Sequence, residues 1–263
     1  MSANRLEEIL QARRQDIAGL KAQSVELRRQ ALLRNDFRSL RLALRRADER
    51  VAVIAEVKQA SPSAGVIVER FDPVEIASRY QGAGADAISV LTEEKFFKGS
   101  LDHLRQVRAA VKCPILRKDF IVDEVQIAES AVAGADAILL IVAALSQEEL
   151  VRFRETATAF QLDAIVEVQS LAEMERAIAA DAEIIGINNR DLTTLKVDLA
   201  VTEELAEEIP SDVIAISESG IRTEHDFARI AQSGVNAVLI GESFLRGDLS
   251  LDRIRHPMPN GRN

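Results

Sequence analysis

The middle of the chain reads 132-VAGADAILLIV-142, and two other stretches repeat its pattern, 82-GAGADAISV-90 and 232-QSGVNAVLI-240. In each copy a segment of small residues reaches a glycine, a short turn follows, and a run of apolar residues comes next. Glycine adopts the left-handed conformation that ends a helix at little cost, so each copy predicts a junction between a helix and a buried strand. Three copies of one junction predict a fold built from a repeated helix–strand unit.

Short apolar runs rich in β-branched residues recur along the chain, and segments with helical periodicity such as 101–111 and 147–160 separate them. Runs without polar alternation are typical of parallel strands that are buried on both faces. Eight such units predict a closed (β/α)8 TIM barrel of the α/β class. An open doubly wound sheet is the competing fold, but no GxGxxG loop follows the first run. The predicted strands cover residues 51–57, 86–92, 114–118, 136–142, 164–168, 184–188, 213–217 and 236–241.

We expect one domain over residues 1–263, with an N-terminal helical extension at 1–50, the barrel at 51–255 and a tail at 256–263. Residues 1–50 contain twelve Arg and Lys and seven Asp and Glu, a net charge of +5, so the remainder must sum to −14 to give the total of −9. We expect the extension to lie against the barrel and to bring positive charge close to an anionic substrate. A solvated helical appendage is the alternative.

Composition narrows the class of protein. The 263 residues are 47% hydrophobic and 29% charged, which is typical of a soluble globular protein. The net charge of −9 favours neither nucleic acid nor an anionic membrane as a partner. The start of the chain has no apolar signal segment, and no apolar run reaches about 18 residues, so we expect a cytoplasmic protein. The single cysteine, Cys113, excludes an intramolecular disulfide bond.

Polar residues occur where the predicted strands end, which is the face of a barrel that carries the active site. Buried charges are either paired or functional, because an isolated buried charge is costly. A structural ion-pair network is one interpretation, for example Glu56 with Lys58 and Glu167 with Lys118. Convergence of charges from several strands at one rim favours a catalytic cavity instead. The strand-end residues are Glu56, Lys58, Lys118, Glu167, Asn188, Arg190, Glu218, Ser219, Gly220, Gly241 and Glu242.

The last two predicted strands end in 217-SESG-220 and 240-IGES-243. Barrels often bind phosphate between these two loops, because glycine lets backbone N–H groups approach the anion. In the loop after the first strand, Ser61 and Ser63 are candidate hydrogen-bond donors, although an ordinary turn explains these residue types equally well. The sequence contains no HExxH or CxxC motif and no carboxylate-rich loop, so we expect no metal site.

Seven stretches, in order along the chain, resemble the conserved blocks of indole-3-glycerol-phosphate synthases. The resemblance covers nearly the whole chain and includes the N-terminal helical region. Two positions differ from the family's usual pattern: Ala64 stands where a lysine is common, and Gln169 occupies a variable polar position. The blocks are 54-IAEVKQASPSAG-65, 88-ISVLTEEKFFKGS-100, 115-ILRKDFIVDEVQI-127, 165-IVEVQ-169, 186-GINNRDLTTL-195, 216-ISESGI-221 and 239-LIGESFLR-246.

The resemblance implies closure of an indole ring in tryptophan biosynthesis. The implied substrate is 1-(2-carboxyphenylamino)-1-deoxyribulose 5-phosphate, and the products are indole-3-glycerol phosphate, CO2 and water, with no cofactor. Lys118 matches the family's general acid for ring closure, and Glu167 a carboxylate that assists proton transfer and stabilises a cationic intermediate. Lys58 matches a group that binds the substrate carboxylate or protonates the departing hydroxyl, and Glu56 would hold Lys58 and act as a base. The division of the dehydration step between Lys58 and Glu167 stays open.

The resemblance also implies the binding residues. Asn188 and Glu218 are expected to orient the sugar hydroxyls and the catalytic groups. Rival interpretations are a phosphoribosylanthranilate isomerase, which would need a Cys/Asp acid–base pair, and a non-catalytic scaffold barrel. We expect a monomer that binds a small phosphorylated substrate, with other enzymes of the pathway as possible partners. The expected substrate or phosphate ligands are Ser61, Arg190, Ser219, Gly220, Gly241 and Glu242, and the expected apolar wall is Phe96, Phe120, Leu140 and Leu192, for which plain barrel packing is the alternative.

Overall fold

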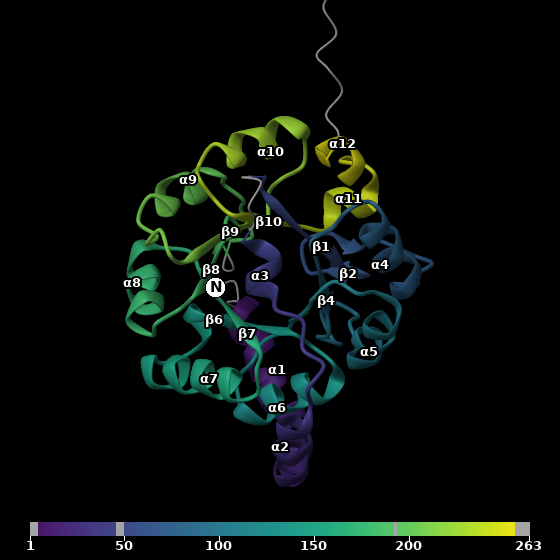
Figure 1. Ribbon diagram of the computed structural model, residues 1–263, viewed down its shortest axis with the longest axis vertical. Helices are drawn as coiled ribbons and strands as arrows, with labels where there is room; N and C mark the ends of the chain where they lie inside the picture. The colour runs from purple at the N-terminus through teal and green to yellow at the C-terminus, as the bar shows by residue number, and fades with distance from the viewer. Residues whose placement is uncertain (1–4, 46–49, 192–193, 256–263) are drawn as a thin grey trace, which may run out of the picture.

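Eight parallel strands form a closed barrel in the computed structural model, which describes residues 5–45, 50–191 and 194–255 (Figure 1). The barrel closes where its first and last strands pair, with Ala55 opposite Ile240. All eight predicted strands and the predicted (β/α)8 barrel are therefore confirmed. In order around the barrel the strands are β1 (Ala52–Val57), β10 (Ala237–Ile240), β9 (Ile214–Glu218), β8 (Ile184–Asn188), β7 (Asp163–Val168), β6 (Ala137–Ile141), β5 (Ile115–Lys118) and β4 (Ala87–Leu91).

Side chains alternate along each strand between the barrel interior and the layer beneath the helices. In β7, Ile165 and Glu167 face the interior, whereas Val166 packs under the helices. Interior apolar residues such as Ile54 and Leu116 are completely buried. The lower part of the barrel is therefore a packed core, and the charged residues lie above it at the C-terminal ends of the strands.

A ring of helices surrounds the strands (Figure 1). Several helices begin with reciprocal side-chain caps, as at Asp123 and Ser146, which bond the free backbone N–H groups of the first turn. The three repeated glycines, Gly84, Gly134 and Gly234, have φ of 88°, 98° and 81°, which confirms the predicted helix–strand junctions. The surrounding helices are α4 (Pro73–Gly82), α5 (Leu101–Ala110), α6 (Glu124–Ala133), α7 (Gln147–Ala159), α8 (Leu171–Ala179), α9 (Ala200–Ala206), α10 (Glu224–Ala231), α11 (Glu242–Arg246) and α12 (Leu251–Arg255).

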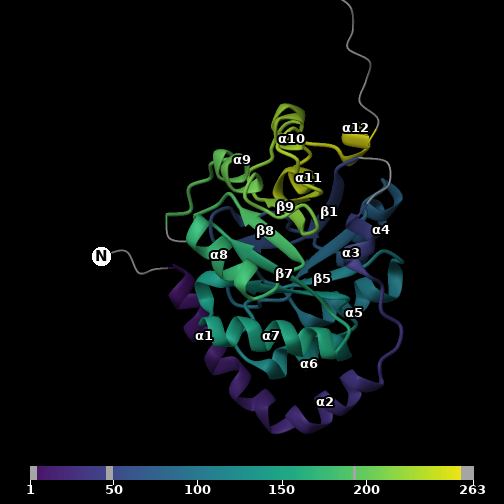
Figure 2. The same cartoon turned by 60° about the vertical axis from the view of Figure 1, so that its left-hand side comes forward.

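The chain before the barrel forms α1 (Arg5–Leu20), a 3-10 turn η1 (Lys21–Gln23), α2 (Ser24–Leu33) and α3 (Leu40–Leu44). Helix α2 packs along α6, and Figure 2 shows α1 and α2 following one side of the barrel. Helix α3 closes the N-terminal end of the barrel, because Leu40 and Leu44 are buried in the same cluster as the strand residues. The segment therefore lies against the barrel, as predicted, and the solvated appendage is excluded.

Part of the positive charge of this segment is held in structural contacts with the barrel, and the expectation that the segment brings positive charge close to the substrate stays a prediction. Arg13 pairs with Asp119 at 2.7 Å, and Arg34 pairs with the buried Asp136 at 3.0 Å. The guanidinium of Arg38 donates to the backbone carbonyls of Val111 and Cys113 at the N-terminal side of β5. Of the arginines in this segment that the structure describes, Arg5 alone lines the cavity described below.

Within the described ranges, no helix is both long enough and apolar enough to span a bilayer. The predicted tail at 256–263 lies outside the described residues.

Candidate active site

A cavity of about 410 Å³ lies at the C-terminal end of the barrel. Its polar wall includes Glu56, Lys118, Glu167, Asn188 and Glu218, contributed by five different strands. Each of these residues occupies an inward-facing position near the end of its strand, so the barrel geometry brings together side chains that are up to about 160 residues apart in sequence. The rim predicted from the strand-end charges is therefore one continuous site.

Lys118 is the centre of the polar cluster. Its Nζ donates to Glu167 Oε2 at 3.1 Å and to Glu218 Oε2. Both carboxylates are almost completely buried, with 3% and 1% exposure. Two acceptors on strands β7 and β9 hold the ammonium group in place, while one side of it stays open to the cavity. Ion pairing and access to a ligand therefore coexist at Lys118.

A second ion pair lies beside the first. Lys58 Nζ, in the loop after β1, donates to Glu56 Oε1 within β1. A Cβ atom at position 241 would lie 2.5 Å from Glu56 Oε1, which is closer than real contacts allow. Gly241 is therefore needed at the end of β10 because any side chain there would displace the Glu56 carboxylate.

Burial and the charge of the ion-pair partner act in opposite directions on the pKa values of Lys118 and Glu218. Burial alone would lower the pKa of Lys118, but the carboxylates of Glu218, Glu167 and Glu56 more than offset this and raise it above its ordinary value. Burial raises the pKa of Glu218 to about 7, with added repulsion from Glu167 and Glu56 and an opposing attraction from Lys118. Lys118 is thus an ammonium ion at neutral pH, and Glu218 can change protonation state near neutrality.

Glu218 has an oxygen, Oε1, that is buried and has no hydrogen-bond partner in the part of the chain that the structure describes. This oxygen faces β8, where a Cβ atom at position 186 would lie 2.2 Å from it. Gly186 therefore makes the space that the carboxylate occupies. An unpaired buried oxygen is costly, and such groups are typical of sites that await a ligand or a proton.

The other end of the cavity has the features of an anion site. Arg190 lines it, and its Nη1 donates to the Leu195 carbonyl at 3.1 Å. Ser219 and Gly220 follow β9 with φ of 67° and 93°, so two consecutive residues are left-handed. A serine in this conformation is strained, and such strain concentrates at functional sites. The side chains of Arg222 and Arg246 add positive charge to the same wall.

The family model described as "Indole-3-glycerol phosphate synthase" matches residues 6–256 of the chain. The chain belongs to the indole-3-glycerol phosphate synthase family. An indole-3-glycerol phosphate synthase of Chloroherpeton thalassium is 48% identical over 247 residues, which cover 92% of this chain and 95% of the relative. Those of Chlorobium luteolum and Acetivibrio thermocellus are 50% and 52% identical and cover 90% and 78% of this chain, and 91% and 79% of the respective relatives. The family's enzymes are decarboxylating lyases of tryptophan biosynthesis.

The apolar wall differs from the sequence-based expectation for this indole-3-glycerol phosphate synthase family member. Phe120 lines the cavity as predicted, but the neighbouring phenylalanine Phe97 lines it in place of Phe96. Leu140 is completely buried in the layer beneath the helices, because Leu139 and Ile141 take the inward positions on either side of it. Leu192 lies outside the described residues.

Helix α1 completes the apolar wall with Leu6 and Ile9, which the sequence analysis did not single out. These residues pack with Phe120 in one cluster. Their three-residue spacing on a helix was the available signal, since it places both on one face. The partners of that face lie more than 100 residues away in the sequence, so their identity could not be predicted.

The remaining predicted ligands also line the cavity: Ser61, Gly241 and Glu242. Ser61 lies in the short hairpin of β2 (Ala60–Ser61) and β3 (Gly65–Val66), where its Oγ accepts from the Ala64 backbone at 3.2 Å. The Gln169 side chain donates to the Arg190 carbonyl at 2.5 Å, so this variable position supports the backbone of a cavity residue. Among residues 5–45, 50–191 and 194–255, no group of three His, Cys, Asp or Glu could hold a metal ion.

Proposed function

We propose that this chain closes the indole ring of 1-(2-carboxyphenylamino)-1-deoxyribulose 5-phosphate and releases CO2 and water. One observation carries the proposal: a buried ammonium group, Lys118, lies between two carboxylates in a cavity with an apolar wall on one side and arginines on another. The substrate has matching parts, namely an aromatic ring and a phosphate joined by a ketose. A cavity of about 410 Å³ is in the usual range for a ligand of this size.

In the ring-closure step, Lys118 donates a proton to the ketose carbonyl oxygen while the aryl carbon that bears the carboxylate attacks the carbonyl carbon. A new C–C bond forms, and the electron pair of the C=O bond becomes the O–H bond. The ring system is then cationic, and the buried carboxylate of Glu167 stabilises it. The raised pKa of Lys118 keeps the proton in place until the substrate arrives.

Decarboxylation follows without any further acid. The bond between the ring and the carboxylate breaks, and its electron pair restores the aromatic ring. Dehydration then removes a hydroxyl group from one carbon and a proton from its neighbour. Lys58 protonates the departing hydroxyl, or Glu167 does so once it has taken up a proton from solvent, and Glu56, adjacent to Lys58, accepts the proton from carbon.

The other polar residues orient the substrate. Asn188 Oδ1 accepts from the Arg190 backbone at 3.0 Å, which links the sugar-binding region to the phosphate end. Glu218, like Glu167, accepts a hydrogen bond from Lys118 and holds it in place. The guanidinium of Arg190 and the backbones after β9 and β10, at Ser219–Gly220 and Gly241–Glu242, bind the phosphate. Phe97, Phe120, Leu6 and Ile9 surround the aromatic ring.

The test is turnover of the synthetic substrate by the purified protein, followed by indole fluorescence. The chain contains no tryptophan and one tyrosine, so light at wavelengths that tyrosine does not absorb excites the indole product without exciting the protein. Indole fluorescence that grows with enzyme concentration, together with one CO2 released per product, supports the proposal. A folded protein that binds the substrate but forms no indole would favour the non-catalytic scaffold and overturn it.

A further inference from the structure

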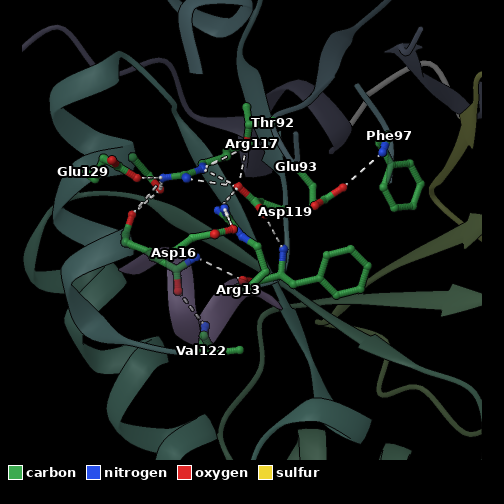
Figure 3. A network of polar contacts seen from close by, with 12 residues as sticks. Arg13, Asp16, Thr92, Glu93, Phe97, Arg117, Asp119, Val122 and Glu129 are labelled. Atoms are coloured by element: carbon green, nitrogen blue, oxygen red, sulfur yellow. Dashed lines mark hydrogen bonds and ion pairs between the residues drawn. The ribbon is translucent and has the colours of Figure 1, made fainter. Parts of the chain in front are cut away.

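Asp119 follows Lys118 directly, and its side chain is completely buried. Its Oδ2 accepts from Thr92 Oγ1 at 2.6 Å, from Arg13 at 2.7 Å and from Arg117 at 3.0 Å (Figure 3). Its Oδ1 accepts from the Phe120 backbone at 2.8 Å. One carboxylate therefore connects the end of β4, the end of β5 and helix α1.

The two arginines in this network have different surroundings. Arg117 is 2% exposed and also contacts α6, through Ser130 and an ion pair of 2.9 Å with Glu129. It anchors β5 to α6 whether or not α1 is present. Arg13 is the contribution of α1, and its partner Asp119 lies 106 residues away in sequence.

Charge balance explains why Arg13 is held there. Arg117 is shared between the buried Asp119 and the partly exposed Glu129, so these three residues carry a net negative charge, which Arg13 offsets while it also contacts the exposed Asp16 at 3.6 Å. An uncompensated buried charge is strongly unfavourable, so the barrel offers α1 a specific electrostatic docking point. Helix α1 cannot move away from the barrel without restoring that imbalance.

Arg13 shares a face of α1 with the two residues that cover the cavity. Leu6, Ile9 and Arg13 are separated by three and four residues, the spacing that places side chains in one row along a helix. Leu6 and Ile9 line the cavity, while Arg13 is fixed one turn further along. A contact that fixes Arg13 therefore also fixes Leu6 and Ile9 over the cavity.

We infer that Arg13 and Asp119 form a latch that positions α1 over the aromatic end of the cavity, with Asp119 positioning Phe120 on the facing wall through its other oxygen. Arg13 is then a positioning residue for substrate binding, and it acts through α1 without touching the reacting atoms. This inference rests on the proposed function, since Leu6 and Ile9 are proposed to contact the aromatic ring of that substrate.

The test compares Arg13→Met with Arg14→Met. The two arginines are neighbours on α1, and each substitution removes one positive charge, but Arg14 is 54% exposed and its nearest carboxylate is 3.7 Å away on Glu7. We expect Arg13→Met to raise KM by about tenfold, equivalent to ~1.4 kcal/mol of binding, with kcat within about threefold of the wild type. Arg14→Met should leave both constants within about twofold, and Arg13→Lys should recover part of the loss because it keeps the charge.

Hydrogen exchange provides a second readout that does not need turnover. In Arg13→Met, the amides of α1 should exchange faster than in Arg14→Met while the strands of the barrel stay protected. Equal KM values and equal exchange in the two variants would overturn the latch, as would a lower Tm for Arg13→Met with unchanged KM and unchanged α1 exchange. An inactive wild-type protein would overturn the proposed function instead, and the exchange comparison would still decide the latch.

Discussion

Replacing Lys118 with methionine removes the ammonium group and keeps a flexible apolar side chain of similar length. The cavity then lacks the proton donor of the proposed ring closure. Loss of a general acid costs about 10²–10⁴ in rate, so turnover should fall by that factor. The matched control is Lys112→Met, because Lys112 is an exposed lysine near the opposite end of the barrel.

The same substitution changes stability, because Glu167 and Glu218 lose the cation that they share. Removal of one partner of a buried ion pair costs about 3–5 kcal/mol when the remaining charge stays buried. Protonation of Glu218 reduces this cost, since burial already raises its pKa to about 7 and loss of Lys118 raises it further. A carboxyl group whose pKa is higher in the folded than in the unfolded state destabilises the protein increasingly as pH rises from about 4 toward the folded value.

The Tm difference between wild type and Lys118→Met should therefore be small near pH 5 and larger near pH 8. Circular dichroism gives the Tm values, and indole fluorescence gives the turnover. A variant that keeps more than about a tenth of wild-type turnover would refute Lys118 as the general acid. A Tm difference that is the same at both pH values would refute the electrostatic account of the buried cluster.

Three further predictions concern other parts of the molecule. Gly186→Ala would place a Cβ atom 2.2 Å from Glu218 Oε1 and should lower kcat with little change in KM, whereas an unchanged kcat would show that the carboxylate has room to move. Gly220→Val puts a side chain at φ 93° and 2.6 Å from Val197, so KM should rise strongly, and normal binding of inorganic phosphate and substrate by the folded variant would place the phosphate elsewhere. Deletion of residues 1–45 should abolish cooperative thermal unfolding, because α3 closes the barrel; a truncated protein with a sharp transition would contradict this.

The sequence predicted the barrel and its charged rim because both depend on local patterns. Apolar runs gave the strands, and the three repeated glycines marked the beginnings of three of them. A charge inside an apolar run also fixed which residues face inward: Glu167 must point to the cavity, so Val166 must point outward. Glu218 follows an apolar run in the same way, whereas Lys118 lies between the charged residues Arg117 and Asp119, so its position at the end of a strand and the family resemblance placed it at the cavity.

Leu140 was misplaced because its strand has no such marker. The run 137-AILLI-141 is apolar at every position, as is usual for a strand buried on both faces, so nothing in it distinguishes inward from outward residues. Pairing with β7 shows which residues of this strand face inward, because Ile141 lies opposite Glu167, which lines the cavity. Phe96 and Phe97 could not be distinguished for a related reason, because they lie in a turn where neither a helical nor a strand period applies.

The source of positive charge at the site also depends on tertiary structure. The sequence placed an excess of basic residues in the first fifty positions, beside a barrel whose remainder is acidic. In the folded protein Arg13 and Arg34 neutralise the buried carboxylates Asp119 and Asp136. Most of the cations that line the cavity come from the barrel, with Lys118 at the end of β5 and Arg190 in the segment after β8, and α1 adds Arg5. Because Arg13 neutralises a residue adjacent to Lys118, the basic N-terminus is tied to the site through the position of α1.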